Sequence, residues 1–328
     1  MKAIQFSRFG KPTEVAECVD VEEPAPPGAG EVLISVEASP INPSDLLTLS
    51  GEYGRLPQLP ATPGNEGVGR VLSVGSGVTH LKQGDRVLLP LGARTWRERL
   101  TADATRTVKL PETGDPLQLS MIAVNPPTAL LMLKLAPLKP GDWVIQNAAN
   151  SAVGQYLITF ARQQGLKTIN LVRREMLVAP LKAMGADVVL VDGEDLQKRV
   201  RVATGGGQVG LGIDAVGGAA TQRLASAVSP GGTVVNYGML SGEVCHMAPA
   251  DLIFRGITLT GFWLTTWFTR TPADEVRRTM QTVVDQVAGG ALHAKVEATY
   301  PLTQITDAVR HAGQPGREGK VLLVPTER

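Results

Sequence analysis

The 328-residue sequence is poor in several kinds of residue, and each shortage excludes a class of protein. It has two cysteines, Cys18 and Cys245, which leaves no disulfide framework and no CxxC metal-binding pair. Aromatic residues make up 4% of the chain, which argues against a base-stacking surface for nucleic acid. The formal net charge is +1, so no broad field attracts nucleic acid or an anionic membrane.

Long apolar runs and targeting signals are missing as well. No stretch reaches the length of a membrane span. The N-terminal residues MKAIQFSRFG contain neither an apolar h-region nor an Arg-rich presequence. Together with the low cysteine content, these features predict a cytoplasmic protein. The length suits two domains, each with room for a core.

The stretch from Asp142 to Glu175 is the most informative part of the chain. It reads as strand, tight turn, helix and strand, which is the half-unit of a dinucleotide-binding fold. The small-residue turn Ala148–Gly154 places backbone N–H groups at a helix N-terminus, where a pyrophosphate is stabilised. Arg173 and Arg174 follow the second strand, where an acidic residue would bind a ribose 2′-hydroxyl. Two arginines there favour a 2′-phosphate, so we expect NADPH.

The turn departs from the usual glycine pattern. Ala149 and Ser151 occupy positions where glycine is common, and Gly154 alone keeps its place near the helix–strand contact. An ordinary strand–helix–strand unit without a ligand is therefore the alternative interpretation. The loops that follow later strands supply further cofactor candidates, and they are Val216–Gly218, Tyr237–Leu240 and Phe262–Thr265.

The distribution of elements predicts two domains. Short strands and dense Gly/Pro turns before residue 117 indicate an antiparallel, barrel-like domain, with strands at Lys2–Phe6, Val32–Ala38, Gly67–Val74 and Arg86–Leu91. A helix is expected over 117–135, despite its two prolines. Alternation then predicts a doubly wound parallel α/β sheet, with strands at 143–147, 168–172, 187–191, 211–215, 232–236 and 257–261 and helices at 151–164, 176–184, 195–203 and 219–228.

The C-terminal region completes this division. A helix is expected over 272–289, followed by mixed β-structure that ends in a strand at Lys320–Val324. We therefore predict a discontinuous catalytic domain of residues 1–117 and 266–328 and a nucleotide-binding (Rossmann) domain of residues 118–265. A cleft between two such domains is a usual place for a ligand.

Ligands for a metal are absent where a catalytic zinc would be expected. Zinc needs three protein ligands from Cys, His, Asp or Glu and an open position. The two candidate segments instead contain Asn42–Pro43 and Asn65–Glu66, and neutral amides are poor zinc ligands. We expect no metal. Without a Lewis acid, reduction of a C=C bond conjugated to a carbonyl is easier than reduction of a ketone, because hydrogen-bond donors suffice for the enolate oxygen.

Six segments together resemble the zinc-independent branch of the medium-chain dehydrogenase/reductase superfamily. They are INPSD (41–45), GEYGRLPQLPATPGNEGVG (51–69), VNPPTA (124–129), VIQNAANSAVGQ (144–155), TINLVRR (168–174) and LIFRGITLTGFWL (252–264). Within that branch the chain is most similar to the trans-2-enoyl-thioester reductases of fatty-acid synthesis. The resemblance implies a GroES-like catalytic domain, a Rossmann domain, NADPH as cofactor and an enoyl thioester of CoA or acyl-carrier protein as substrate.

The resemblance also implies site residues. Tyr53 matches the catalytic tyrosine of the family; from the residues alone it is equally well a loop tyrosine with its hydroxyl in water. Asn42 is a second candidate catalytic residue, as a donor or positioning group, or else it caps a turn. Thr128 is added as a cofactor candidate in the expected helix. Residues that match the family's cofactor contacts are Asn125, Asn150, Ser151, Ala152, Val153, Arg173, Arg174, Glu175, Tyr237, Gly238, Met239, Leu240, Phe262, Trp263, Leu264, Thr265 and Lys320.

Two other functions remain open at this point. One is a quinone or enone oxidoreductase of the same superfamily, which needs no tyrosine. The other is a catalytically silent NADPH-binding protein. Relatives imply a homodimer. An acyl-carrier protein is a further candidate partner, because Arg94, Arg97, Arg99 and Arg106 form a basic run, although Glu98 and Asp103 offset it as on an ordinary solvated face.

Overall fold

The computed structural model describes residues 1–325, and the chain divides into two compact units. Unit 1 comprises residues 1–124 and the segment from 277 onward, and unit 2 comprises residues 125–276. The two domain boundaries predicted from the sequence, after residues 117 and 265, lie somewhat earlier in the chain than those of the structure. The last three residues of the predicted catalytic domain, 326–328, lie outside the described residues. No helix within residues 1–325 is long and apolar enough to cross a membrane.

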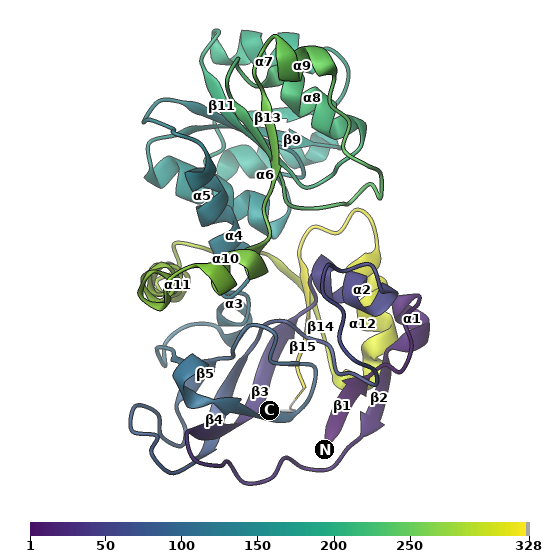
Figure 1. Ribbon diagram of the computed structural model, residues 1–328, viewed down its shortest axis with the longest axis vertical. Helices are drawn as coiled ribbons and strands as arrows, with labels where there is room; N and C mark the ends of the chain where they lie inside the picture. Colours follow the sequence, from purple (N-terminus) through teal and green to yellow (C-terminus); the bar gives the residue numbers. More distant parts are fainter. Residues whose placement is uncertain (326–328) are drawn as a thin grey trace. The chain divides into compact units, whose positions relative to one another are not determined.

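Unit 2 is built on a six-stranded parallel sheet, drawn in the upper part of Figure 1. The strand order is β10-β9-β8-β11-β12-β13, so the chain winds outward from β8 in one direction and then outward from β11 in the other. This is the doubly wound topology that the alternation predicts, and the predicted fold class is confirmed. The strands are β8 (Trp143–Gln146), β9 (Lys167–Val172), β10 (Val188–Val191), β11 (Val209–Asp214), β12 (Thr233–Asn236) and β13 (Thr258–Gly261).

Helices pack on both faces of this sheet. On one face α7 and α8 bury Leu196, Val200 and Leu224 against Ile145 and Ile169 of the central strands. On the other face α5 and α6 pack through a second apolar cluster. The bounds are α4 (Asn125–Met132), α5 (Ala152–Gln163), α6 (Val178–Ala183), α7 (Leu196–Thr204), α8 (Ala219–Ala227), α9 (Pro249–Ile253) and α10 (Leu264–Arg270), with 3-10 turns at η2 (Leu133–Leu135) and η3 (Glu175–Leu177).

The helix that follows the nucleotide turn shows why this region folds as it does. In α5 the buried residues Val153, Tyr156, Leu157, Phe160 and Ala161 recur every three or four positions, which gives the helix one apolar face. The strands on either side are almost wholly buried, as strands covered on both faces must be. The turn between β8 and α5 therefore lies where well-packed central strands of the sheet end.

Unit 1 contains a seven-stranded, mostly antiparallel sheet in the order β14-β15-β3-β4-β5-β7, with β6 paired to β3. In the long strand β3, Val32, Ile34, Val36 and Ala38 are buried at alternate positions, so one face covers a core. Within residues 1–325 this sheet is open and does not close into a barrel. The strands are β3 (Glu31–Pro40), β4 (Val68–Val74), β5 (Arg86–Leu88), β6 (Arg99–Asp103), β7 (Val108–Lys109), β14 (Val296–Tyr300) and β15 (Lys320–Leu323), and a separate pair is β1 (Lys2–Gln5) with β2 (Glu17–Asp20).

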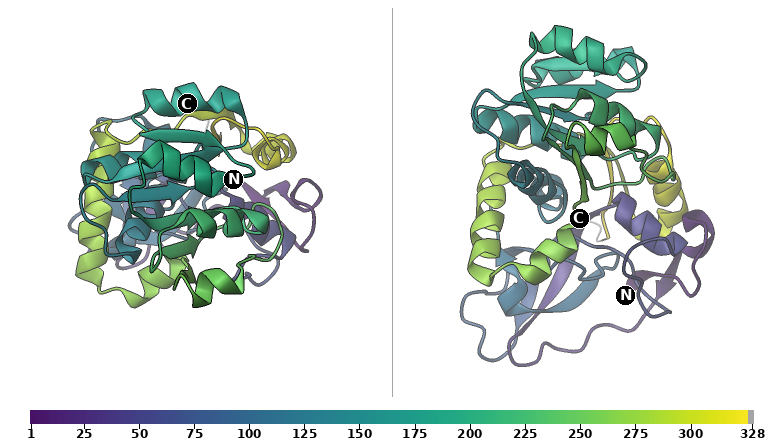
Figure 2. Two further views of the ribbon diagram at one scale, coloured as in Figure 1. Left: turned by 90° about the horizontal axis from the view of Figure 1, so that it is seen from above. Right: turned by 45° about the horizontal axis from the view of Figure 1, so that its top comes forward.

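Several helices of unit 1 are not predicted from the sequence. The C-terminal region, expected to be mixed β, contains helix α12, which packs beside α1 and α2 from the other end of the chain (Figure 2). In α12 the buried residues Ile305, Ala308, Val309 and Ala312 have helical spacing, but a helix this short gains most of its stability from packing. The bounds are α1 (Pro12–Val15), α2 (Pro43–Ser50), α3 (Pro116–Leu119), α11 (Ala273–Ala288, which crosses from unit 2) and α12 (Ile305–Gly313), with η1 (Ala104–Arg106) and η4 (Leu302–Gln304).

The single helix expected over 117–135 is wrong. Helix α3 ends at Leu119, a turn follows, and α4 begins at Asn125. Pro126 and Pro127 are therefore in the first turn of α4 and not in the middle of a helix. A proline is favourable there because its missing N–H has no partner within the helix in any case.

Candidate functional site

The turn between β8 and α5 in unit 2 has the geometry of a phosphate-binding turn. Ser151 is the N-cap of α5, and its hydroxyl accepts a hydrogen bond from the Gly154 N–H at 3.1 Å. Ala148 adopts a left-handed backbone with φ of 47°. A Cβ at position 154 would stand 2.5 Å from the Ala149 carbonyl oxygen, so only glycine fits. The turn thus keeps the one glycine that close packing demands.

A buried carboxylate joins the ends of three strands beside this turn. Asp214, at the end of β11, accepts hydrogen bonds from Asn147 (2.6 Å), Thr221 (2.6 Å) and Asn236 (3.2 Å). Asn147 follows β8, and Asn236 ends β12. The two neighbouring strands β8 and β11 are where the strand order reverses, which is the usual place for a dinucleotide in such a sheet. Asn147, Asp214 and Asn236 are not among the predicted site residues, although each is polar and stands at the end of an apolar strand.

The charge state of Asp214 follows from this environment. Burial opposes ionisation, but the hydrogen bonds from Thr221, Asn147 and the amides of Gly217 and Val216 outweigh it and lower the pKa. The carboxylate is therefore ionised at neutral pH and acts as an acceptor that holds the strand ends in register.

The loop after β12 approaches the same turn. The Tyr237 hydroxyl is hydrogen-bonded to Ser151; burial raises the pKa of Tyr237, and this hydrogen bond opposes the rise. A Cβ at Gly238 would meet the Ala215 carbonyl oxygen at 2.6 Å, so the backbone also passes closely here. Two of the predicted cofactor residues, Ser151 and Tyr237, are thus brought together. Met239 and Leu240 continue the loop and are exposed.

Arg173 is an exposed cationic side chain that directly follows β9. It makes no hydrogen bond or ion pair with any residue in the described part of the chain. The nearby carboxylate of Asp192 is already paired with Arg223, at 2.8 and 2.6 Å. Arg174 and Glu175 stand at the start of η3. The donors of Arg173 are therefore available to an anion.

The remaining predicted cofactor residues of unit 2 occupy three elements. Asn125 and Thr128 are buried in α4, which packs on α5. Asn150, Ala152 and Val153 belong to the turn and the first turn of α5. The segment after β13 holds Phe262, Trp263, Leu264 and Thr265; of these, Leu264 is buried and Trp263 is exposed.

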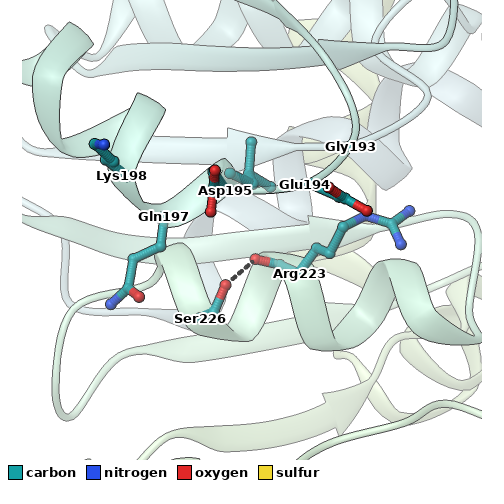
Figure 3. A pocket seen from close by; sticks show the side chains of 8 residues that line it. Gly193, Glu194, Asp195, Gln197, Lys198, Arg223 and Ser226 are labelled. Atoms are coloured by element: carbon teal, nitrogen blue, oxygen red, sulfur yellow. Dashed lines mark hydrogen bonds between the residues drawn. The ribbon is translucent and has the colours of Figure 1, made fainter.

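A separate hollow of about 640 Å³ opens elsewhere in unit 2, at the start of α7 (Figure 3). Its lining includes Glu194, Asp195, Lys198, Arg223 and Ser226. None of the predicted cofactor residues belongs to it, and its charges are mixed. We therefore do not assign it to the nucleotide.

Unit 1 contains a buried polar network around Asn42. The Asn42 Oδ1 accepts a hydrogen bond from the Lys320 ammonium, and its Nδ2 donates to Glu66 at 2.8 Å. The other oxygen of Glu66 accepts the Val124 N–H at 2.9 Å. All three side chains are at least nine-tenths buried, with exposures of 2% for Asn42, 0% for Glu66 and 8% for Lys320. Lys320, a predicted cofactor residue, thus lies in unit 1 with the predicted catalytic Asn42.

Asp45 fixes the backbone on both sides of this network. It is the third residue of helix α2, and its carboxylate accepts the Asn42 N–H at 2.8 Å as one half of a capping box. Its other oxygen accepts the backbone and side-chain N–H groups of Asn65, which precedes Glu66. Burial raises the pKa of Asp45 to about 6, against the lowering effect of these hydrogen bonds and of Lys320. For Glu66 burial raises the pKa, and for Lys320 burial lowers it, while their mutual attraction opposes both shifts.

This network does not fit a zinc ion. The oxygen of Asn42 is taken by an ammonium group, and the amide groups of Asn42 and Asn65 donate to Glu66 and Asp45. No group of three or more His, Cys, Asp or Glu side chains suited to a metal ion occurs among residues 1–325. A lysine ammonium at this place would repel a second cation.

Tyr53 lies at the opposite end of the same helix. Helix α2 ends at Ser50, Gly51 caps it with φ of 85°, and the Tyr53 N–H donates to the Leu47 carbonyl oxygen at 3.1 Å. The residue is half-buried. Asn42 and Tyr53 are therefore held by one helix of eight residues, about 12 Å long.

Comparisons with known proteins agree with this geometry. Residues 28–112 match the alcohol dehydrogenase GroES-like domain, and residues 152–287 match the zinc-binding dehydrogenase family. The chain is 36% identical to the mitochondrial enoyl-[acyl-carrier-protein] reductase of Bos taurus over 98% of its length and 88% of the relative. A putative NADPH:quinone reductase structure from Bacillus thuringiensis superposes with a TM-score of 0.90 at 29% identity, covering 99% of both chains.

A third relative is the structure of a complex of Etr1p, NADP and crotonyl-CoA. It superposes with a TM-score of 0.87 at 26% identity, covering 98% of this chain and 99% of that one. With the fold and the site geometry, these similarities show that this chain belongs to the medium-chain dehydrogenase/reductase superfamily, on the branch of enoyl thioester reductases and quinone oxidoreductase-like proteins.

Proposed function

We propose that the protein is an NADPH-dependent reductase of the C=C bond of a trans-2-enoyl thioester, presented by CoA or by an acyl-carrier protein. The observation that carries this proposal is the Lys320–Asn42–Glu66 network, which lies in unit 1 at the two segments where a catalytic zinc would be expected from the sequence and supplies no ligand set for one. A site without a Lewis acid suits conjugate reduction. The relatives named as enoyl-[acyl-carrier-protein] reductase and as a complex with crotonyl-CoA support the same substrate class.

The residues of unit 2 fit NADPH. The amides at the start of α5 face a pyrophosphate position, and the helix dipole favours a negative charge there. Arg173 and Arg174 bind the 2′-phosphate through charge-assisted hydrogen bonds. Tyr237 and Gly238 approach the same turn and bring the backbone close to a flat ring. When bound, NADPH supplies a hydride to the β-carbon of the substrate.

In this proposal Tyr53 stabilises the negative charge that hydride addition creates on the thioester oxygen. A phenol is protonated near neutral pH, so its O–H donates to the thioester oxygen as negative charge gathers there. The same O–H then delivers a proton to the α-carbon, which completes the reduction. Asn42 is separated from Tyr53 by the length of α2, and its amide already serves Glu66 and Lys320. We therefore assign Asn42 to positioning.

The test is a substrate panel with NADPH, scored by oxidation of the cofactor. We expect turnover of crotonyl and longer enoyl thioesters, and a loss of at least about a hundredfold in kcat/KM in Tyr53→Phe. Tyr300→Phe is a matched control, because it removes a phenolic hydroxyl of the same unit that bonds His311 at 2.9 Å. That variant should lose about 0.5–1.5 kcal/mol of stability and keep its turnover.

A quinone or enone oxidoreductase is the second candidate, favoured by the similarity to the Bacillus thuringiensis structure. Two results would establish this function. The protein would reduce quinones but no enoyl thioester, and wild type and Tyr53→Phe would have equal rates. Tight NADPH binding without turnover of either class would instead indicate a catalytically silent protein.

The acyl-carrier partner is supported by two arginines of unit 1. Arg94 and Arg97 line a hollow of about 920 Å³, and neither forms an ion pair with any residue from 1 to 325. Arg99, in contrast, is paired with Glu23. If an acidic carrier docks here, kcat/KM for carrier-linked substrates should fall with rising salt more steeply than for CoA substrates.

We also infer a homodimer and a cytoplasmic location. Strand β13 is a free edge of the unit 2 sheet within the described chain, and Ile253 and Phe254, which precede it in the sequence, are 69% and 84% exposed. An open edge with exposed apolar neighbours favours pairing with a second copy. Light scattering of wild type and Phe254→Asp tests this, because a monomeric wild type would refute it. Cys18 and Cys245 are unpaired, as a reducing compartment requires.

A further inference from the structure

A carboxylate stands directly beside Arg173, at the edge where the parallel strands of unit 2 end. The Asp192 N–H donates to the Val172 carbonyl oxygen at 2.8 Å, which continues the register in which Val191 pairs with Val172. Asp192 is therefore opposite Arg173 on the neighbouring strand, and such strands lie about 4.8 Å apart. An arginine and an aspartate in these positions are within reach of each other. If they paired, the charge of Arg173 would be neutralised before a cofactor bound.

Arg223 of helix α8 prevents that pairing. Its Nε donates to one oxygen of the Asp192 carboxylate at 2.8 Å, and its Nη2 donates to the other at 2.6 Å. Both oxygens are thus occupied by one planar guanidinium, which is the strongest geometry for such a pair. The pair is partly buried, with side-chain exposures of 36% for Arg223 and 16% for Asp192. Arg173, in contrast, has no hydrogen-bond or ion-pair partner among residues 1–325.

The charge of Arg223 itself is secure. The hydrogen bond to Asp192 raises the pKa of Arg223, burial opposes the rise, and the carboxylates of Asp192 and Asp214 add to it. The guanidinium and its carboxylate are therefore both ionised at neutral pH, and they cancel each other at the edge of the sheet.

An unpaired Asp192 would treat the two nicotinamide cofactors differently. It would repel a 2′-phosphate, which carries a charge of about −1.5 to −2 at neutral pH, and it would compete with that phosphate for Arg173. NADH has a hydroxyl in place of the phosphate, and a carboxylate near the ribose accepts a hydrogen bond from such a hydroxyl. The pairing of Asp192 therefore bears on the choice of cofactor.

We propose that Arg223 is a positioning residue that makes the protein select NADPH over NADH: it holds the Asp192 carboxylate and so leaves Arg173 to the 2′-phosphate. All three residues belong to unit 2. Arg223 acts through Asp192 and does not itself touch the cofactor. This inference rests on the proposed function, because it takes Arg173 as a ligand of the 2′-phosphate.

The test is a double-mutant cycle in the full chain, with the Kd for NADPH and for NADH measured by fluorescence titration at a pH of about 7.5, above the titration of the phosphate at about 6. Arg223→Gln should raise the Kd for NADPH about tenfold and leave that for NADH within about twofold. Adding Asp192→Asn should return the Kd for NADPH to within about threefold of wild type, because no carboxylate then remains to be held. Asp192→Asn alone should not weaken NADPH binding.

The rescue decides between acting through Asp192 and acting directly. A double variant that binds NADPH as weakly as Arg223→Gln would overturn the proposal, because Arg223 would then serve the phosphate or the fold itself. A rise in both Kd values by the same factor would overturn it as well. Should Arg223→Gln not fold, Arg223→Lys replaces it, since an ammonium is a point charge that cannot bind the carboxylate as a fork. The Kd for NADPH should then rise at least about twofold and return when Asp192→Asn is added. No rise would again overturn the proposal.

Arg255→Gln is the matched control. Arg255 is another arginine of unit 2 that pairs with an aspartate, Asp251 at 2.6 Å, but its carbonyl oxygen accepts the Gly231 N–H before β12, at the opposite edge of the sheet. Its loss should leave the ratio of the two Kd values unchanged, and an equal change in that ratio would refute the role of Arg223. Absence of NADPH binding by wild type would refute the proposed function, whereas NADPH preference without rescue would refute the role of Arg223 alone.

Discussion

Gly154→Ala is the sharpest test of the nucleotide turn. A Cβ at this position would lie 2.5 Å from the Ala149 carbonyl oxygen, 2.7 Å from its Cα and 2.8 Å from its carbonyl carbon. All three are backbone atoms, so no side chain can rotate away, and the turn must move by roughly half an ångström or more to reach an ordinary contact distance. Such overpacking costs about 1–3 kcal/mol.

Two hydrogen bonds would be lost or lengthened by that movement. The Gly154 N–H donates to the Ser151 hydroxyl, and its carbonyl oxygen accepts from Gln146 at 2.9 Å. Each contributes about 0.5–1.5 kcal/mol. Alanine gains about 1 kcal/mol of helix propensity over glycine, which offsets part of the cost. If both hydrogen bonds are lost, we expect a net loss of about 1–5 kcal/mol in the free energy of unfolding.

The same substitution should also weaken the binding of NADPH. The displaced amides are those that we assign to the pyrophosphate, so the Kd for NADPH should rise about tenfold, equivalent to about 1.4 kcal/mol. Denaturant unfolding and NADPH fluorescence titration measure the two quantities. Gly193→Ala is the control in the same unit, because a Cβ there meets only the Arg199 guanidinium at 3.9 Å. A stabilised Gly154→Ala protein with unchanged Kd would refute the reasoning.

Two further predictions concern charge. Replacing Arg173 and Arg174 by alanine should raise the Michaelis constant for NADPH and barely affect that for NADH, because only NADPH carries the 2′-phosphate; equal effects in steady-state kinetics would contradict the assignment. The lowered pKa of Asp214 means that its contribution to stability is present above its ordinary value of about 4 and is lost as the pH falls through its folded pKa. Asp214→Asn should remove this acid dependence and cost about 2–4 kcal/mol in denaturant unfolding at neutral pH, because its amide nitrogen would face donors; unchanged stability at both pH values would argue against it.

Local patterns in the sequence account for the parallel sheet of unit 2. Apolar runs followed by small or polar residues predict β8, β9 and β11, and the buried positions of α5 repeat with the period of a helix. Arg173 was identified in the same way, because a strand end and the residue after it are neighbours in sequence. These features depend on contacts within a few residues, and a single sequence carries them.

Other features of the structure could not be predicted from residues close together in the chain. The mixed β-structure predicted for the C-terminal region does not include helix α12, because a nine-residue helix gains its stability from packing, here on α1 and α2 at the other end of the chain. The break between α3 and α4 was missed because the pattern does not say whether Pro126 begins a helix or interrupts one. Asp214 is not predicted as a site residue, because its hydrogen-bond partners are distant in the chain, at the ends of β8 and β12 and in helix α8.

The sequence by itself determined the alternation of strands and helices, the small-residue turn and the two arginines that follow β9, because each is encoded by residues close together in the chain. Only the tertiary structure decided what replaces the missing metal ligands. The Lys320 ammonium meets Asn42 across 278 residues, and Glu66 reaches Val124 across 58. Buried charges must find partners to offset their lost hydration, and which partners they find depends on how the sheet of unit 1 brings distant strands together.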